Sequence, residues 1–181
     1  MKSIKFSFCV LVLIATMPGA VGQKYVTEAT VVSFFSHATI EDIAAANKKA
    51  VGIFNTSNGD IAFSVPIQEF TFAKSLMQEH FNEKYMESDK YPKSTFQGKI
   101  SDFNIAATGV QNVKASGRLT IHGVTNNIDV PGTIEKEGEK LLMKSKFKVK
   151  LQDYKIAIPQ LLWQNIAEEV EVTLEFAFKP Q

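Results

Sequence analysis

The chain has 181 residues, and its 20 basic and 19 acidic residues give a formal net charge of +1 at pH 7. This balance provides no basic footprint for a nucleic acid and no polybasic run for an anionic membrane surface, so we predict no nucleic-acid partner. Cys9 is the only cysteine, so the fold must be stabilised by its apolar core, to which the 14 phenylalanines of the chain can contribute.

Residues 1–22 are predicted to be a secretory signal peptide. Two lysines precede an apolar run over residues 6–17, which Pro18 ends and the small residues 20–22 follow. The run is shorter than the roughly 20 residues that a membrane span needs, so we expect no stable span, and an uncleaved anchor is the weaker alternative. The expected product is an exported protein, periplasmic or secreted, with one domain over residues 23–181.

The first part of this domain has the pattern of β-strands. Apolar and β-branched residues alternate with polar ones over residues 24–36, 48–55 and 60–72. Asn58-Gly59 lies between two of these runs and predicts a hairpin. Residues 39–47 are ambiguous, because they fit either a short helical turn or a loop that leads back into the sheet.

An amphipathic helix then interrupts the strands. Met77, Phe81 and Tyr85 follow one another at intervals of four residues, the spacing of one helix face. Ser75 and Gln78 are predicted to form a capping box at its start. The helix must end before Pro92, which cannot continue it.

Strands resume over residues 93–105, and the next strands form a predicted hairpin between residues 112 and 136. Its first strand alternates Leu119 and Ile121 with polar residues. We interpret Gly123 as a bulge or a close backbone approach in this strand. The reversal is placed at Asn126-Asn127, because asparagine tolerates a positive φ.

The last two strands, residues 140–151 and 169–178, have complementary outer faces. Lysines occupy most of the outward positions of the first strand, and glutamates occupy most of those of the second. Opposite charges across a strand pair stabilise it by about 0.2–1 kcal/mol each, so we predict that these strands are antiparallel neighbours. Residues 159–165 between them are predicted to form a short helix.

These elements predict an all-β fold, an antiparallel up-and-down barrel of about eight strands with an inserted amphipathic helix. Such a barrel is wide enough for side chains or one small ligand, and closure leaves no unpaired edge. From the alternation we expect these residues to line the interior: Phe34, Phe63, Val65, Phe70, Phe72, Phe96, Met143, Phe147, Leu174 and Phe176. We expect five more to close its mouths: Met77, Phe81, Leu161, Leu162 and Trp163.

Two segments resemble the YceI-like family of exported, lipocalin-like barrels linked to polyisoprenoid binding. The first is the heptapeptide Leu119–Thr125, and the second combines Glu79-His80-Phe81 with the run Tyr85–Pro92 and Thr95-Phe96. The resemblance spans nearly all of residues 23–181. Family members often carry Arg-Asp where this chain has Met77 and Gln78, and a basic residue at Asn82. If those charges contact an anionic head group in the family, this chain lacks them, and the departure predicts a ligand whose head group is neutral or small and polar.

The function expected from these observations is that of a carrier for a long-chain apolar ligand, such as a polyisoprenoid, an isoprenoid quinone or a fatty-acid-like lipid. We expect no enzyme activity, cofactor or metal site. The histidines at positions 37, 80 and 122 lack the spacing of a zinc motif, and no Gly-x-Ser-x-Gly elbow is present. An enzyme acting on a bound lipid and an outer-membrane barrel are the alternatives, and a homodimer is left open.

Overall fold

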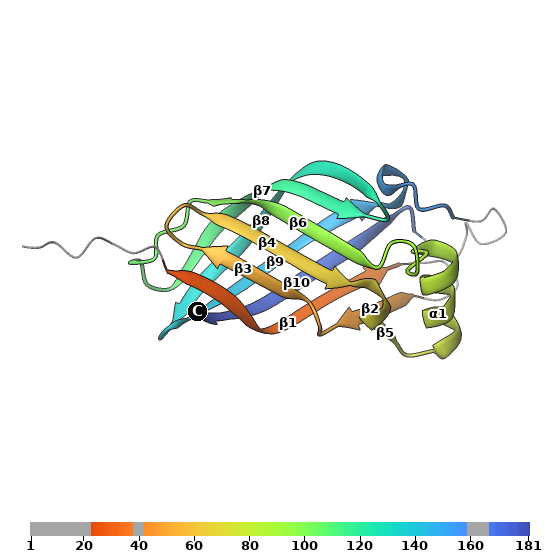
Figure 1. Ribbon diagram of the computed structural model, residues 1–181, viewed down its shortest axis with the longest axis horizontal. Coiled ribbons are helices and arrows are strands. Elements are labelled where there is room, and N and C mark those ends of the chain that lie inside the picture. Colours follow the sequence, from red (N-terminus) through yellow and green to blue (C-terminus); the bar gives the residue numbers. More distant parts are fainter. Residues whose placement is uncertain (1–22, 38–41, 159–166) are drawn as a thin grey trace, which may run out of the picture.

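Ten strands of the described chain form one antiparallel sheet that closes on itself (Figure 1). The structure is a computed structural model, and it describes residues 23–37, 42–158 and 167–181. The strands are β1 (Lys24–Ser36), β2 (Ile43–Asn47), β3 (Val51–Asn55), β4 (Asp60–Pro66), β5 (Thr71–Phe72), β6 (Lys93–Ser101), β7 (Val110–Ile121), β8 (Val124–Glu137), β9 (Lys140–Lys150) and β10 (Glu169–Pro180). The helical segments are η1 (Ile67–Glu69), α1 (Ser75–His80), η2 (Phe81–Tyr85) and η3 (Leu151–Tyr154).

The sheet closes because β1 pairs with β10 along one edge and with both β2 and β3 along the other. The strands β2 and β3 therefore lie end to end and occupy one strand position beside β1. In the same way β5, which pairs with β2, and β4, which pairs with β3, occupy the next strand position. Counted in this way the barrel has eight strand positions in sequence order, which confirms the predicted up-and-down barrel. The ambiguous residues 39–47 include a strand, β2, whose place is decided by its two neighbours.

Asn47 holds the bend between β2 and β3. Its side chain is fully buried, and its amide nitrogen donates to the Pro66 carbonyl at 2.6 Å. Its amide oxygen accepts from the Lys49 backbone N–H at 2.8 Å. One buried side chain thus satisfies two backbone groups where the ladder is interrupted.

Asn47→Ala should lower the free energy of unfolding by about 1–3 kcal/mol, because the Pro66 carbonyl and the Lys49 N–H lose their partner. Urea denaturation of the full chain measures the change. The exposed Asn127 on β8 is the matched control, and Asn127→Ala should leave the midpoint almost unchanged. Equal losses in the two variants would contradict this account of the bend.

The β7–β8 hairpin turns four residues earlier than the sequence suggested. Ile121 pairs with Val124, so the turn consists of His122 and Gly123, with φ values of 50° and 74°. Two positive φ angles define the tight turn that suits the twist of a hairpin. The predicted bulge at Gly123 and reversal at Asn126-Asn127 are therefore wrong, since these asparagines pair with β7 within β8. The alternative interpretation of Gly123, a close approach to its backbone, agrees with the structure, because a Cβ there would lie 2.5 Å from the Tyr91 ring.

The other hairpins agree with the pattern. Asn58-Gly59 lies in the turn between β3 and β4, as predicted. The predicted pairing of the last two strands is also confirmed, from Glu169–Lys150 to Phe178–Leu141. Lys146 lies 2.7 Å from Glu171 across this pair, and Glu169 lies within 3.7 Å of both Lys148 and Lys150.

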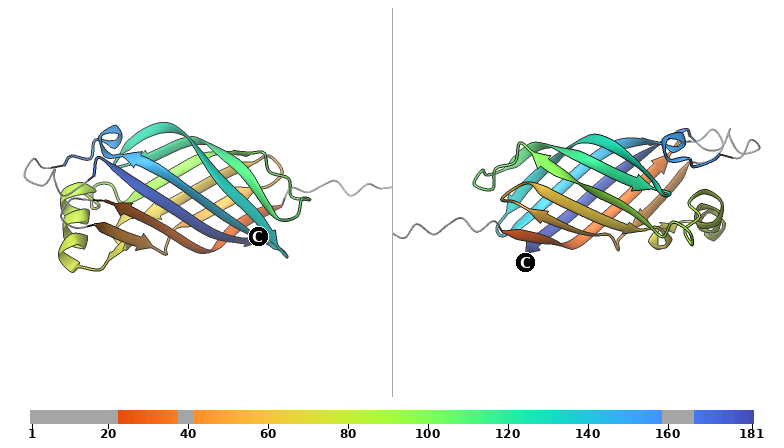
Figure 2. Two further views of the ribbon diagram at one scale, coloured as in Figure 1. Left: turned by 180° about the vertical axis from the view of Figure 1, so that it is seen from behind. Right: turned by 45° about the horizontal axis from the view of Figure 1, so that its top comes forward.

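The helix covers one end of the barrel (Figure 2). α1 continues directly into η2, a π-helical turn, so Met77, Phe81 and Tyr85 share one helical segment as predicted. The capping box is wrong: Lys74 is the N-cap without a side-chain bond, and the Gln78 amide oxygen accepts from the Phe72 N–H at 3.3 Å instead. The predicted helix over residues 159–165 lies outside the described residues.

The end of the barrel opposite the helix is solidly packed. Phe54 and Phe178 are fully buried there, with ring centroids 6.4 Å apart, and Phe103 packs 5.5 Å from Phe54. Tyr25, Ile61, Ile134 and Leu141 complete this end with at most 3% exposure. Whatever space the barrel encloses must therefore lie towards the helix.

Candidate functional site: an apolar cavity

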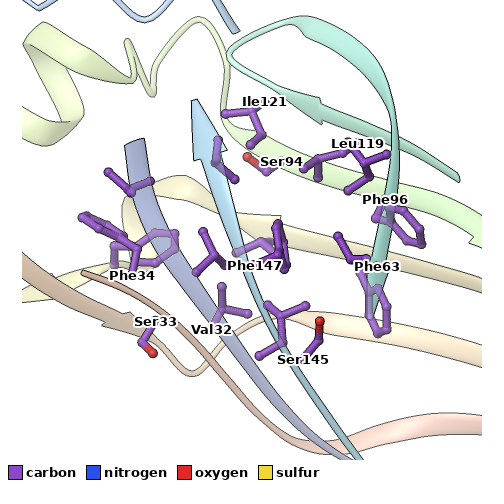
Figure 3. A pocket seen from close by; sticks show the side chains of 18 of the residues that line it. Val32, Ser33, Phe34, Phe63, Ser94, Phe96, Leu119, Ile121, Ser145 and Phe147 are labelled. Carbon is purple, nitrogen blue, oxygen red and sulfur yellow. The ribbon is translucent and has the colours of Figure 1, made fainter. Parts of the chain in front are cut away.

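The helix half of the barrel encloses a cavity of about 420 Å³. Side chains from β1, β4, β6, β7 and β9 converge on it, as Figure 3 shows for Phe34, Phe63, Phe96, Leu119 and Phe147. Its size falls within the range of about 300–1,000 Å³ that is typical of small-molecule sites. The wall is predominantly aliphatic and aromatic, so the cavity favours an apolar occupant.

The wall contains all ten residues that alternation placed inside: Phe34, Phe63, Val65, Phe70, Phe72, Phe96, Met143, Phe147, Leu174 and Phe176. Met77 and Phe81, expected to close a mouth, also line it from the helix. Leu161, Leu162 and Trp163 lie outside the described residues. That any of these residues contacts a ligand stays a prediction.

An aromatic cluster closes the cavity beneath the helix. The Phe81 ring lies 5.5 Å from Phe34, 5.5 Å from Phe70 and 5.0 Å from Phe72, measured between centroids. Aromatic pairs at these distances contribute about 0.5–1.5 kcal/mol each beyond the area they bury. The cluster therefore fixes the helical segment to the barrel as well as filling its mouth.

The cavity wall carries few polar side chains, and most of them are uncharged. Ser33, Ser94 and Thr95 line it from strands, while His80 and Tyr85 line it from the helical segment. Burial raises the pKa of the Tyr85 phenol, so this side chain is a neutral hydroxyl at physiological pH. These groups suit a hydrogen-bonding head group better than a densely charged one.

Part of the wall was missed in the sequence. Leu119 and Ile121 of β7, with Ile128 and Val130 of β8, form one side of the cavity. Their period of two already assigned them to the inner face, so alternation could have found them. Met86 and Ile156 carry no such signal, because they lie outside the strands and reach the cavity through the fold alone.

His122 packs outside the cavity and joins three segments. Its Nδ1 donates to the Tyr154 carbonyl at 3.2 Å. Its Nε2 lies 2.8 Å from the Glu87 carboxylate. The Tyr91 ring contacts His122 edge-on at 4.5 Å. These contacts link the end of η2 to the β7–β8 turn and to η3.

Within the described part of the chain, no cluster of His, Cys, Asp or Glu could hold a metal ion. No helix there is long and apolar enough to cross a membrane. The arrangement thus offers enclosure of an apolar molecule, with a few polar groups to orient it.

Comparison with known proteins agrees with this geometry. Residues 24–178 match the YceI-like domain. The chain belongs to the YceI-like family. The resemblance carried by Leu119–Thr125 and the helical segment is thereby confirmed. No curated protein matches this YceI-like chain in sequence.

Solved structures with the same fold include three from different bacteria. Burkholderia cenocepacia BcnA superposes with a TM-score of 0.70 at 17% identity, covering 82% of this chain and 95% of that one. A polyisoprenoid binding domain from Saccharophagus degradans, implicated in plant cell wall breakdown, gives 0.75 at 17% identity, covering 87% and 98%. The Campylobacter jejuni YCEI protein gives 0.56 at 16% identity, covering 99% and 93%. At these identities the likeness shows the shared fold.

Proposed function

We propose that this YceI-like chain is a carrier that holds one long-chain apolar ligand in the cavity of its barrel. The observation that carries the proposal is the cavity itself. If the interior of the barrel served only as a hydrophobic core, side chains would fill both halves of the barrel. Here one half is solid around Phe54 and Phe178, and the other half is a cavity lined by apolar side chains.

The ligand class follows from the wall. Each buried methylene contributes about 0.8 kcal/mol, so ten of them supply about 8 kcal/mol before the costs of association are subtracted. A polyisoprenoid, an isoprenoid quinone or a fatty-acid-like lipid meets this requirement. The polyisoprenoid binding reported for the Saccharophagus degradans relative supports the first of these classes.

A neutral or small polar head group fits this chain. The helical segment contributes the polar side chains of His80 and Tyr85 to the cavity, together with the apolar Met77. An enzyme acting on the bound lipid would need a convergent acid and base inside the cavity. His122 and Glu87, which do face each other, lie outside it, and this favours a carrier over the enzyme alternative.

We propose further that residues 1–22 direct export and are removed, which places the carrier in the periplasm or outside the cell. The charged outer faces of β9 and β10 favour this over an outer-membrane barrel, whose outward side chains must be apolar. The mass of the chain purified from its own host tests the cleavage.

Native mass spectrometry of protein purified from its own host tests the carrier function. We expect a bound lipid of defined mass that is released on denaturation, and rebinding of an isoprenoid quinone by the delipidated protein. Protein that neither retains nor rebinds a lipid would overturn the proposal. A released fraction made up mainly of prenyl phosphates would overturn only the neutral head group.

A further inference from the structure

The barrel wall is not paired along its whole length. The β8–β9 ladder contains only the pairs from Gly132–Ser145 to Glu137–Lys140. The β7–β8 ladder on the other side of β8 continues to the Ile121–Val124 pair, and the β9–β10 ladder continues to Lys150. Among the described residues, β8 before residue 132 and β9 after residue 145 are therefore unpaired with each other. We call this region, residues 124–131 of β8 and 146–150 of β9, the β8–β9 opening.

The sequence at the foot of the β8–β9 opening ends the ladder. The Pro131 carbonyl accepts from the Ser145 hydroxyl at 2.7 Å, so it faces β9. In an antiparallel strand, the N–H and the C=O of one residue point to the same neighbouring strand. The next backbone N–H that should bond to β9 therefore belongs to residue 131, and proline has no N–H. Ser145 thus caps a carbonyl that has lost its backbone partner.

The far end of the β8–β9 opening is bridged by side chains instead of a ladder. The Asn126 amide donates to the Asp153 carbonyl at 2.8 Å, and His122 bonds to the Tyr154 carbonyl. Both carbonyls belong to η3, which follows β9. Between this far end and the Pro131–Ser145 contact, β8 arches away from β9 (Figures 1 and 2).

The β8–β9 opening leads into the cavity. Ile128 and Val130 of β8 and Phe147 and Val149 of β9 are cavity-wall residues on its two sides. At its foot, Pro131 and Lys144 border the cavity although both are exposed at the surface. The cavity therefore reaches exposed residues on the outside of the barrel at this place. Among the described residues, the Phe81 cluster packs beneath the helix and the Phe54 cluster fills the opposite end.

We infer that the β8–β9 opening is the passage through which the apolar chain of the ligand moves into and out of the cavity. The inference rests on the proposed carrier function. A hydrocarbon chain has no hydrogen bonds to lose in crossing between two strand edges, and water satisfies those edges on the outside. Because Pro131 removes a ladder bond, little paired structure has to break for the strands to separate.

A reducible cross-link across the β8–β9 opening tests the passage. Asp129 and Lys148 would be opposite each other if the ladder continued, and both are exposed. The variant D129C/K148C, in a full chain with Cys9→Ser, is joined with a short bifunctional methanethiosulfonate. The reference is K148C/E171C, whose residues are already opposite in the β9–β10 ladder. Stopped-flow fluorescence follows the uptake of cis-parinaric acid, a polyene fatty acid.

We expect uptake by cross-linked D129C/K148C to slow about tenfold or more, the effect of raising a barrier by about 1.4 kcal/mol. Reduction should restore the rate, and the cross-linked reference should bind at the wild-type rate. Pro131→Val, which restores an N–H on the β9 side, should slow uptake without a cross-link. Unchanged rates in both variants would overturn the passage but not the carrier. Failure of the wild-type chain to bind the probe would overturn the carrier function itself.

Discussion

Phe147→Asp should empty the carrier of its lipid while the barrel stays folded. Phe147 points into the cavity from β9 and is only half-buried, because it lies beside the β8–β9 opening. A carboxylate at this position can reach water while the cavity holds no ligand. A bound hydrocarbon chain would remove that water and leave the charge without a partner, so the penalty falls mainly on the bound state.

We expect this change to weaken retention by about two orders of magnitude or more, which corresponds to about 3 kcal/mol. Native mass spectrometry of the purified variant measures the bound fraction, and circular dichroism checks that the barrel is intact. Phe147→Leu is the matched control on the same site and should retain lipid. Lys146→Asp places the same charge on the outer face and should also retain it. A fully loaded Phe147→Asp protein would remove this residue from the binding site.

Alternation was sufficient to predict ten residues of the wall and the bounds of the long strands. The bounds of β1 were predicted to the residue, and those of β9 and β10 to within two, because long strands with one apolar face repeat the same signal many times. The turn at Asn58-Gly59 was found for a local reason, because Gly59 supplies the positive φ of 77° that the turn requires. In these elements local chemistry and the tertiary fold agree.

The errors occur where distant contacts decide the structure. The turn at His122-Gly123 places a histidine at positive φ, which is uncommon, and its contacts come from Glu87, Tyr91 and Tyr154. The alanines of β2 have little preference for a strand, and pairing with β1 and β5 decides their conformation. Neither set of contacts is visible in a local window of sequence.

The cavity was the harder part of the site to predict. Phe54 and Phe147 both occupy inward positions with the same period, yet one is fully buried in a solid end and the other borders a cavity. Alternation reports which face of a strand a side chain occupies, and the distance across the barrel determines whether that face meets another side chain. Pro131 was a local signal for the β8–β9 opening, because proline within a strand indicates an edge.

Phe54→Ala should be the most destabilising change in the protein, whereas Phe147→Ala should cost much less. The Phe54 ring is fully buried and packs against Phe103 and Phe178, so its removal leaves a void that a rigid surrounding cannot refill. Such substitutions lower the free energy of unfolding by about 3–5 kcal/mol. Phe147 already has the cavity on one side, so alanine there loses fewer contacts and only enlarges an existing space.

Urea denaturation of the two variants measures the difference in the free energy of unfolding. Both proteins are delipidated first, because bound lipid would stabilise the folded state by mass action. Equal losses would mean that the two ends of the barrel are packed alike, and the distinction between a solid end and a binding end would have to be given up.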